Sequence, residues 1–138
     1  MYILHERKRN LRMLKEIITV CLLVLMLTAA LLNIHYLKVL TEDITVLISE
    51  SKNAAVAGDW GKAATTAKHA EKLWDDKTGY THVILRHGEI DTVSDALYDY
   101  ISCINEQDVK ASGAAADKVI YHLDSIYKME QVRFGSIF

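Results

Sequence analysis

Residues 17–34 read IITVCLLVLMLTAALLNI, a run without a charged side chain. At about 1.5 Å per residue, a helix of this length matches the roughly 30 Å hydrocarbon core of a bilayer. The basic residues before the run are Arg7, Lys8, Arg9, Arg12 and Lys15. The single run predicts a single-pass cell-membrane protein. Because basic flanks stay in the cytoplasm, the N-terminus is predicted to be cytoplasmic. We expect a cytoplasmic tail over 1–16, a transmembrane helix over 17–35 and an extracytoplasmic domain over 36–138.

A cleaved signal peptide is the alternative to an anchor. Thr28, Ala29 and Ala30 supply small side chains of the kind found at a cleavage site. The apolar run continues past them to Ile34, and it is longer than the signal-peptide core of about 7 to 15 residues. Both features favour a retained anchor.

The charge of the chain is divided between its two parts. Residues 1–16 carry five Lys and Arg against two Glu, whereas residues 35–138 carry eleven Lys and Arg against sixteen Asp and Glu. A mildly acidic domain has no electrostatic reason to bind nucleic acid. We therefore expect two partners, the membrane through residues 17–35 and an unidentified protein, and leave homo-oligomerisation open.

Proline is absent from all 138 residues, although an average usage of about 5% would supply about seven. Loops and strand edges are where proline normally collects, so its absence favours nearly continuous helix. Four apolar stripes with alternating steps of three and four residues follow the apolar run, as expected of helices that bury one face. The stripes are Leu37, Leu40, Ile44, Leu47, Ser51 and Ala54; Trp60, Ala63, Ala67, Ala70 and Trp74; His87, Ile90, Ser94, Leu97, Ile101 and Ile104; and Ala116, Val119, Leu123 and Ile126.

Polar turns separate the stripes. Asp59 and Asp108 are candidate N-terminal caps, and Thr78-Gly79 is expected to end the second helix. Gly58–Ala63 aligns weakly with Glu106–Ala111 at an offset of 48 residues, which indicates two helical hairpins. The predicted fold is all-α: one transmembrane helix continuing into a four-helix antiparallel domain of two tetratricopeptide-like hairpins.

One cluster of polar residues could form a site. His87 and Asp91 lie four residues apart on one helix face, and His122 on another helix is the obvious further ligand for a metal ion. The favoured interpretation is structural: a half-buried His87 held by Asp91 or by a backbone carbonyl. We expect no enzyme, no catalytic residue, no cofactor and no metal, and structural roles for Trp60, Trp74, His87, Ile90, Leu97, Leu123 and Phe138.

Several short motifs resemble a known family. They are Asp59-Trp60, Trp74, His87-x-Glu89-Ile90-Asp91, His122 and the terminal Ser136-Ile137-Phe138. In order and spacing they resemble the domain of unknown function 4363 family, small proteins mainly of Gram-positive bacteria with a short N-terminal membrane segment. Ser136 stands where that family has asparagine. The resemblance implies a membrane location and a helical architecture, carries no established activity, and draws attention to Glu89 and Phe138.

Three functions are compatible with these features. The leading hypothesis is a protein-protein interaction or scaffold subunit at the cell envelope, since helical hairpins are common peptide-binding units. The second is an extracytoplasmic ligand sensor, although only about 16 residues precede the span. The third is a metal-dependent enzyme or a metal-binding module built on the cluster around His87.

Overall fold

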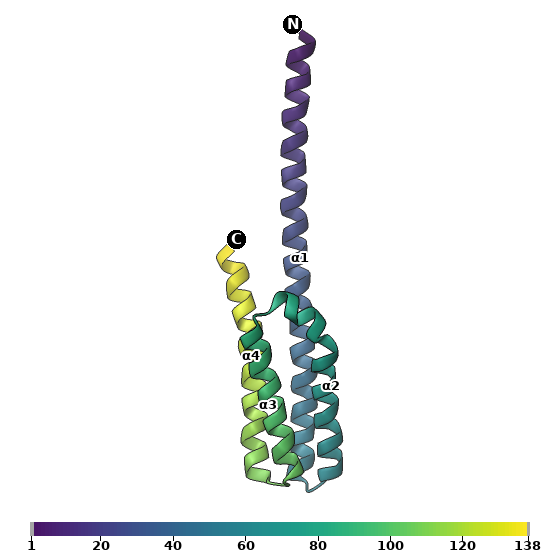
Figure 1. The fold of residues 1–138 in the computed structure, drawn as a ribbon, viewed down its shortest axis with the longest axis vertical. Coiled ribbons are helices and arrows are strands. Elements are labelled where there is room, and N and C mark those ends of the chain that lie inside the picture. Colours follow the sequence, from purple (N-terminus) through teal and green to yellow (C-terminus); the bar gives the residue numbers. More distant parts are fainter. Residues whose placement is uncertain (1, 138) are drawn as a thin grey trace. The chain divides into compact units, whose positions relative to one another are not determined.

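The computed structural model describes residues 2–137 and the side chains of residues 9–77, 79–81 and 85–136. Its elements are four helices: α1 Tyr2–Val56, α2 Trp60–Ile84, α3 His87–Asn105 and α4 Val109–Ile137 (Figure 1). The described residues contain no strand, so the all-α prediction is confirmed. The chain divides into two compact units, one ending at Tyr36 and the other beginning at Leu37. Phe138 lies outside the described residues.

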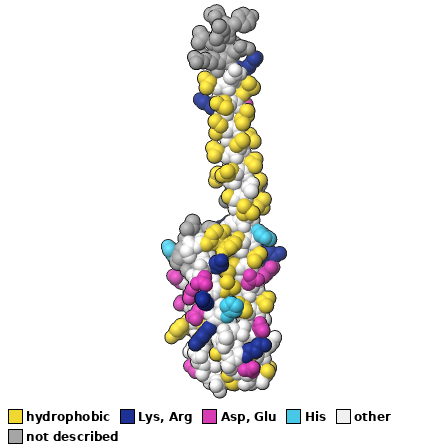
Figure 2. Space-filling model, turned by 90° about the vertical axis from the view of Figure 1, so that its right-hand side faces the viewer, with side chains coloured by type: hydrophobic (Ala, Val, Ile, Leu, Met, Phe, Trp, Pro, Cys, Tyr) yellow, Lys and Arg dark blue, Asp and Glu magenta, His cyan; other side chains and the backbone are white. Residues whose placement is uncertain are grey.

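The first unit, which ends at Tyr36, contains the apolar run of α1. Among the described residues, α1 is the one helix long and apolar enough to cross a membrane, with a best 18-residue window of mean hydropathy 2.7 and no buried side chain. Hydrophobic side chains cover this segment in Figure 2. The Thr19 and Thr28 hydroxyls donate to the carbonyls of Lys15 and Val24 at 2.9 and 2.8 Å. These bonds satisfy side-chain groups that a bilayer could not hydrate.

The second unit is a four-helix bundle formed by residues 37–56 of α1 with α2, α3 and α4. Successive helices run in opposite directions (Figure 1). The core contains Trp74, Ile90, Leu97 and Leu123, each at most 2% exposed.

Two details of the core differ from the expected stripes. Trp60, the first residue of α2, is only half-buried, so the expectation that both tryptophans fill the core is wrong for Trp60. In α1, Ile48 is fully buried whereas the neighbouring Leu47 is half-buried.

One chain of hydrogen bonds crosses three helices inside the bundle. The Tyr100 hydroxyl of α3 donates to Ser51 Oγ of α1 at 2.7 Å, and Ser51 Oγ donates to the Ala63 carbonyl of α2 at 2.7 Å. Ser51, Ala63 and Tyr100 are all completely buried. Because Ala63, Ala67 and Ala70 present only methyl groups, α2 can approach α1 closely enough for the serine to reach a main-chain carbonyl.

The loops α1–α2 and α3–α4 share one hydrogen-bonding pattern. Asp59 N donates to the Ala54 carbonyl and Asp59 Oδ1 accepts from Lys62 N; Asp108 N donates to the Cys103 carbonyl and Asp108 Oδ1 accepts from Ala111 N. Each helix therefore ends in a Schellman motif, followed by an aspartate cap of the next helix. Both predicted caps are confirmed.

The residue with positive φ in each loop fixes the register of the repeat. Gly58 has φ 80° in the first loop, and Gln107 has φ 56° in the second. Gly58 thus corresponds to Gln107 and Asp59 to Asp108, an offset of 49 residues. The expected offset of 48 residues is wrong. It aligned Lys62-Ala63 with Lys110-Ala111 because the residue types are identical, whereas the backbone conformation makes Lys62 equivalent to Ala111.

At this offset most buried positions of the two hairpins coincide. The equivalent buried pairs are Thr41/Ile90, Ile44/Val93, Ile48/Leu97, Ser51/Tyr100, Ala55/Ile104, Ala63/Ser112, Ala67/Ala116, Ala70/Val119, Trp74/Leu123 and Thr81/Glu130. The repeat therefore extends through the core as well as the loops.

Helix α2 does not end at Thr78-Gly79 as expected. It continues to Ile84, where Leu85 adopts an extended conformation and is buried at 5% exposure. A glycine inside a helix costs about 1 kcal/mol relative to alanine, which packing elsewhere in the helix can offset.

Ser51 and Tyr100 generate a stability prediction. Tyr100→Phe should lower the free energy of unfolding by about 1 kcal/mol, and Ser51→Ala by about 1 to 3, because the latter leaves the buried Tyr100 hydroxyl unpaired. The double variant should cost less than the sum of the single variants. Urea unfolding of the full chain in detergent, followed by tryptophan fluorescence, measures all three, and additive costs would contradict the coupling.

The same pair generates a pH dependence. Burial raises the pKa of the Tyr100 phenol above its ordinary value of 10.0, and the hydrogen bond to Ser51 offsets part of the rise. The folded chain thus holds the phenol proton of Tyr100 more tightly than the unfolded chain does. The contribution of the protonated phenol to the free energy of unfolding is therefore complete below pH 10 and is lost as the pH rises above 10. Tyr100→Phe should show a smaller loss of stability than the parent between about pH 9 and pH 11.

Candidate functional site

In the motif from His87 to Asp91, the residue that packs against another helix is Glu89, which contacts α4. His87 and Asp91 are both exposed, whereas Glu89 is half-buried and Ile90 is in the core. The expectation of a half-buried His87 is therefore wrong. The buried positions of α3 include 90, 93, 97, 100 and 104, and the next step of four residues backward reaches Arg86 instead of His87.

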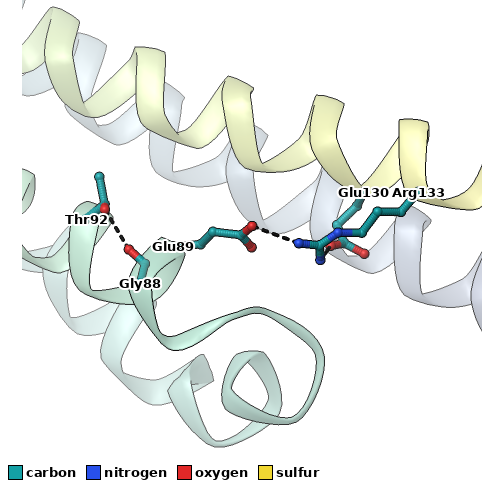
Figure 3. Close-up of polar contacts among 5 residues, drawn as sticks. All are labelled: Gly88, Glu89, Thr92, Glu130 and Arg133. Carbon is teal, nitrogen blue, oxygen red and sulfur yellow. Dashed lines mark hydrogen bonds and ion pairs between the residues drawn. The ribbon is translucent and has the colours of Figure 1, made fainter.

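Glu89 joins an ion-pair cluster with Glu130 and Arg133 of α4 (Figure 3). Arg133 Nη2 lies 3.0 Å from Glu89 Oε1, and Arg133 Nη1 donates to Glu130 Oε1. The side chains are 14% exposed for Glu89, 10% for Glu130 and 34% for Arg133. One guanidinium therefore serves two carboxylates that are largely removed from water.

Local structure explains these positions. Glu89 is the third residue of α3, and the partial positive charge of a helix N-terminus stabilises a carboxylate there. Nearby, the Thr92 hydroxyl donates to the Gly88 carbonyl at 2.6 Å (Figure 3). Glu130 and Arg133 lie three residues apart, so their side chains share one face of α4.

The cluster is not electrically balanced. Two carboxylates face one guanidinium, and the buried Glu89 Oε2 has no hydrogen-bond partner. Removing solvent from an incompletely paired charge is costly, and the Arg133 contacts offset part of that cost.

A small pocket of about 100 Å³ adjoins Glu89. It is lined by Gly88, Glu89, Thr92, His122, Ser125, Ile126 and Met129. The structure thus brings together Glu89 and His122, while His87 and Asp91 do not line this pocket. Within the described part of the chain, no group of three His, Cys, Asp or Glu side chains is placed to hold a metal ion.

A larger groove runs between the bundle segment of α1 and α4. Its volume is about 750 Å³, and it is lined by Lys38, Thr41, Glu42, Thr45, Val46, Asp117, Ile120, Tyr121, Asp124 and Tyr127. On each helix the lining residues are spaced by one helical turn, singly or as adjacent pairs, so each wall is one helix face. Two parallel walls of this kind form a surface that can receive a third helix.

The sequence contained a signal for the ion-pair cluster that was missed. Continuing the fourth stripe from Ile126 by steps of four and three reaches Glu130 and Arg133. Charged residues at core-facing positions of an amphipathic helix indicate buried ion pairs. The groove had no such signal, because it depends on how two helices distant in sequence pack together.

The cluster generates a charge-removal prediction. Arg133→Met should destabilise by about 2 kcal/mol, below the roughly 3 to 5 measured for fully buried pairs, because Arg133 is one-third exposed. Adding Glu89→Gln to that variant should restore part of the loss, since it removes one unpaired charge. Asp91→Asn, an exposed change of the same type, should alter stability by less than about 0.5 kcal/mol. Thermal unfolding monitored by circular dichroism measures these differences, and no rescue by Glu89→Gln would contradict charge sharing.

Comparison with known proteins gives one match. The family model described as Domain of unknown function (DUF4363) matches residues 31–137, from the end of the apolar run through the bundle. No curated protein and no solved structure matches the chain.

Proposed function

We propose, from the premise that this chain belongs to the family described as Domain of unknown function (DUF4363), that it is a single-span membrane protein whose bundle binds protein at the cell envelope. The observation that carries the binding role is the groove between α1 and α4. The observations that support the anchor are the apolar part of α1 and the charge that precedes it.

The anchor follows from solvent preference. Large apolar side chains of α1 are more than half exposed; they include Ile17, Val20, Leu22, Leu23, Val24, Leu25, Met26 and Leu32. Water would disfavour so much apolar surface on one helix, whereas a bilayer would accept it. The basic residues before position 16 then favour a cytoplasmic N-terminus.

The binding role follows from the walls of the groove. Ile120 and Tyr127 are half-buried, whereas Val46 and Tyr121 are 64% and 67% exposed. Apolar side chains along two adjacent helices are the surface that helix-in-groove recognition uses. A binding module of this kind needs no reacting group, only complementary apolar and charged side chains.

The orientation is tested by labelling single cysteines with a membrane-impermeant maleimide in intact cells. The background carries Cys21→Ala and Cys103→Ala, and the test variants add Ser102→Cys or Asn10→Cys, both at exposed positions. Position 102 should be labelled and position 10 protected; the reverse pattern would overturn the orientation. The intact mass of the membrane-bound protein shows whether the N-terminal segment is retained.

The binding role is tested by photo-cross-linking in intact cells. A benzophenone amino acid at Ile120, in the groove, should give discrete protein adducts of the full chain, whereas the same amino acid at the exposed Tyr98 of α3 should give few. Equal adduct formation at the two positions, or none at Ile120, would count against a protein-binding groove.

A further inference from the structure

The internal repeat allows the two contacts between hairpins to be compared residue by residue. At the offset of 49 residues, the contact between α2 and α3 corresponds to that between α4 and α1. In the first contact, Trp74 Nε1 donates to Ser94 Oγ at 3.0 Å, and the indole is fully buried. The equivalent residues of the second contact are Leu123 and Thr45, a smaller apolar side chain and a hydroxyl that lines the groove. The contact between α4 and α1 therefore lacks the aromatic ring that the contact between α2 and α3 buries.

The charges around the groove are balanced. Each carboxylate of its walls pairs with a lysine: Glu42 with Lys38 at 3.7 Å, Asp117 with Lys52 at 2.6 Å and Asp124 with Lys128 at 2.6 Å. By contrast, residues 37–138 carry eleven Lys and Arg against sixteen Asp and Glu. Two copies of the bundle would repel one another through their net charge, but at this face each carboxylate is neutralised by a lysine of its own chain, so a second copy of the same face would meet no such repulsion.

The groove also presents aromatic surface to a partner. Tyr121 lines the groove and is 67% exposed, and its ring meets His122 edge-on with the centroids 5.6 Å apart. Val46 on the opposite wall is 64% exposed. A two-fold axis would bring Tyr121 of each copy against the groove of the other, so one surface supplies both the aromatic ring and the space that receives it.

We propose that the groove between α1 and α4 binds a second copy of this chain, with Tyr121 of each copy entering the groove of the other. The inference rests on the proposed function and names the partner of the same surface. Anchors in one membrane hold the copies in the same orientation and raise their effective concentration, so a small interface suffices.

The test is disulfide cross-linking between two differently tagged full-length chains co-expressed in membranes. Both carry Cys21→Ala and Cys103→Ala; one adds Val46→Cys and the other Tyr121→Cys. Mild oxidation should give a product of twice the chain mass that carries both tags. The matched control replaces Val46→Cys with Tyr98→Cys, a tyrosine 71% exposed on α3, and should give at most about one-tenth of that product.

A second measurement keeps the inference falsifiable if oxidation is inefficient. Tyr121→Asp in both copies should lower co-isolation of the two tags about fivefold or more, because it places two unpaired carboxylates in one interface, whereas Tyr98→Asp should not. Circular dichroism checks that each variant remains helical. Equal products at positions 46 and 98, or unchanged co-isolation in Tyr121→Asp, overturns the second copy as the occupant. A photo-adduct at Ile120 with another protein, in place of a dimer, overturns it too but leaves the binding role intact.

Discussion

The arrangement of α1, α2 and α3 depends on two hydrogen bonds of the Ser51 hydroxyl. The hydroxyl accepts from Tyr100 of α3 and donates to the Ala63 carbonyl of α2, so one side chain of α1 fixes the position of two other helices. This geometry requires a small residue at position 63, since a larger side chain would separate α1 from α2. It also requires a phenol at position 100 that reaches across the core. The serine that sequence analysis placed on an apolar stripe is thus the polar centre of the interior.

The internal repeat explains both the regularity and the asymmetry of the domain. Most equivalent positions are buried in both hairpins, but their side chains differ in size and polarity. Ser51 and Tyr100 occupy equivalent positions and bind each other, and the buried Trp74 corresponds to the smaller and equally buried Leu123. The two hairpins therefore share one backbone plan and differ in the side chains that fill it.

Sequence patterns predicted the helices, the apolar core and the caps at Asp59 and Asp108, because these depend on local periodicity and local hydrogen bonds. They did not predict the register of the repeat, since Gln107 adopts a positive φ without being glycine. They also misplaced Trp60 and His87, which open α2 and α3. The first residue of a helix is buried with the rest of its apolar stripe only if another element packs against that end of the helix. Whether one does depends on tertiary structure, which the local pattern does not contain.

The ion-pair cluster shows how far the two hairpins have diverged. At the offset of 49 residues, Glu89 and Glu130 correspond to Leu40 and Thr81, which are 4% and 1% exposed. The first hairpin thus fills these positions without any charge. Because apolar replacements of buried ion pairs are often neutral or stabilising, stability alone does not account for the charges in the second hairpin. The contact from Glu89 to Arg133 differs from a leucine contact in being directional, because it is satisfied only where the guanidinium meets the carboxylate. Since α4 forms one wall of the groove, the ion-pair cluster and Tyr121 stand on the same helix.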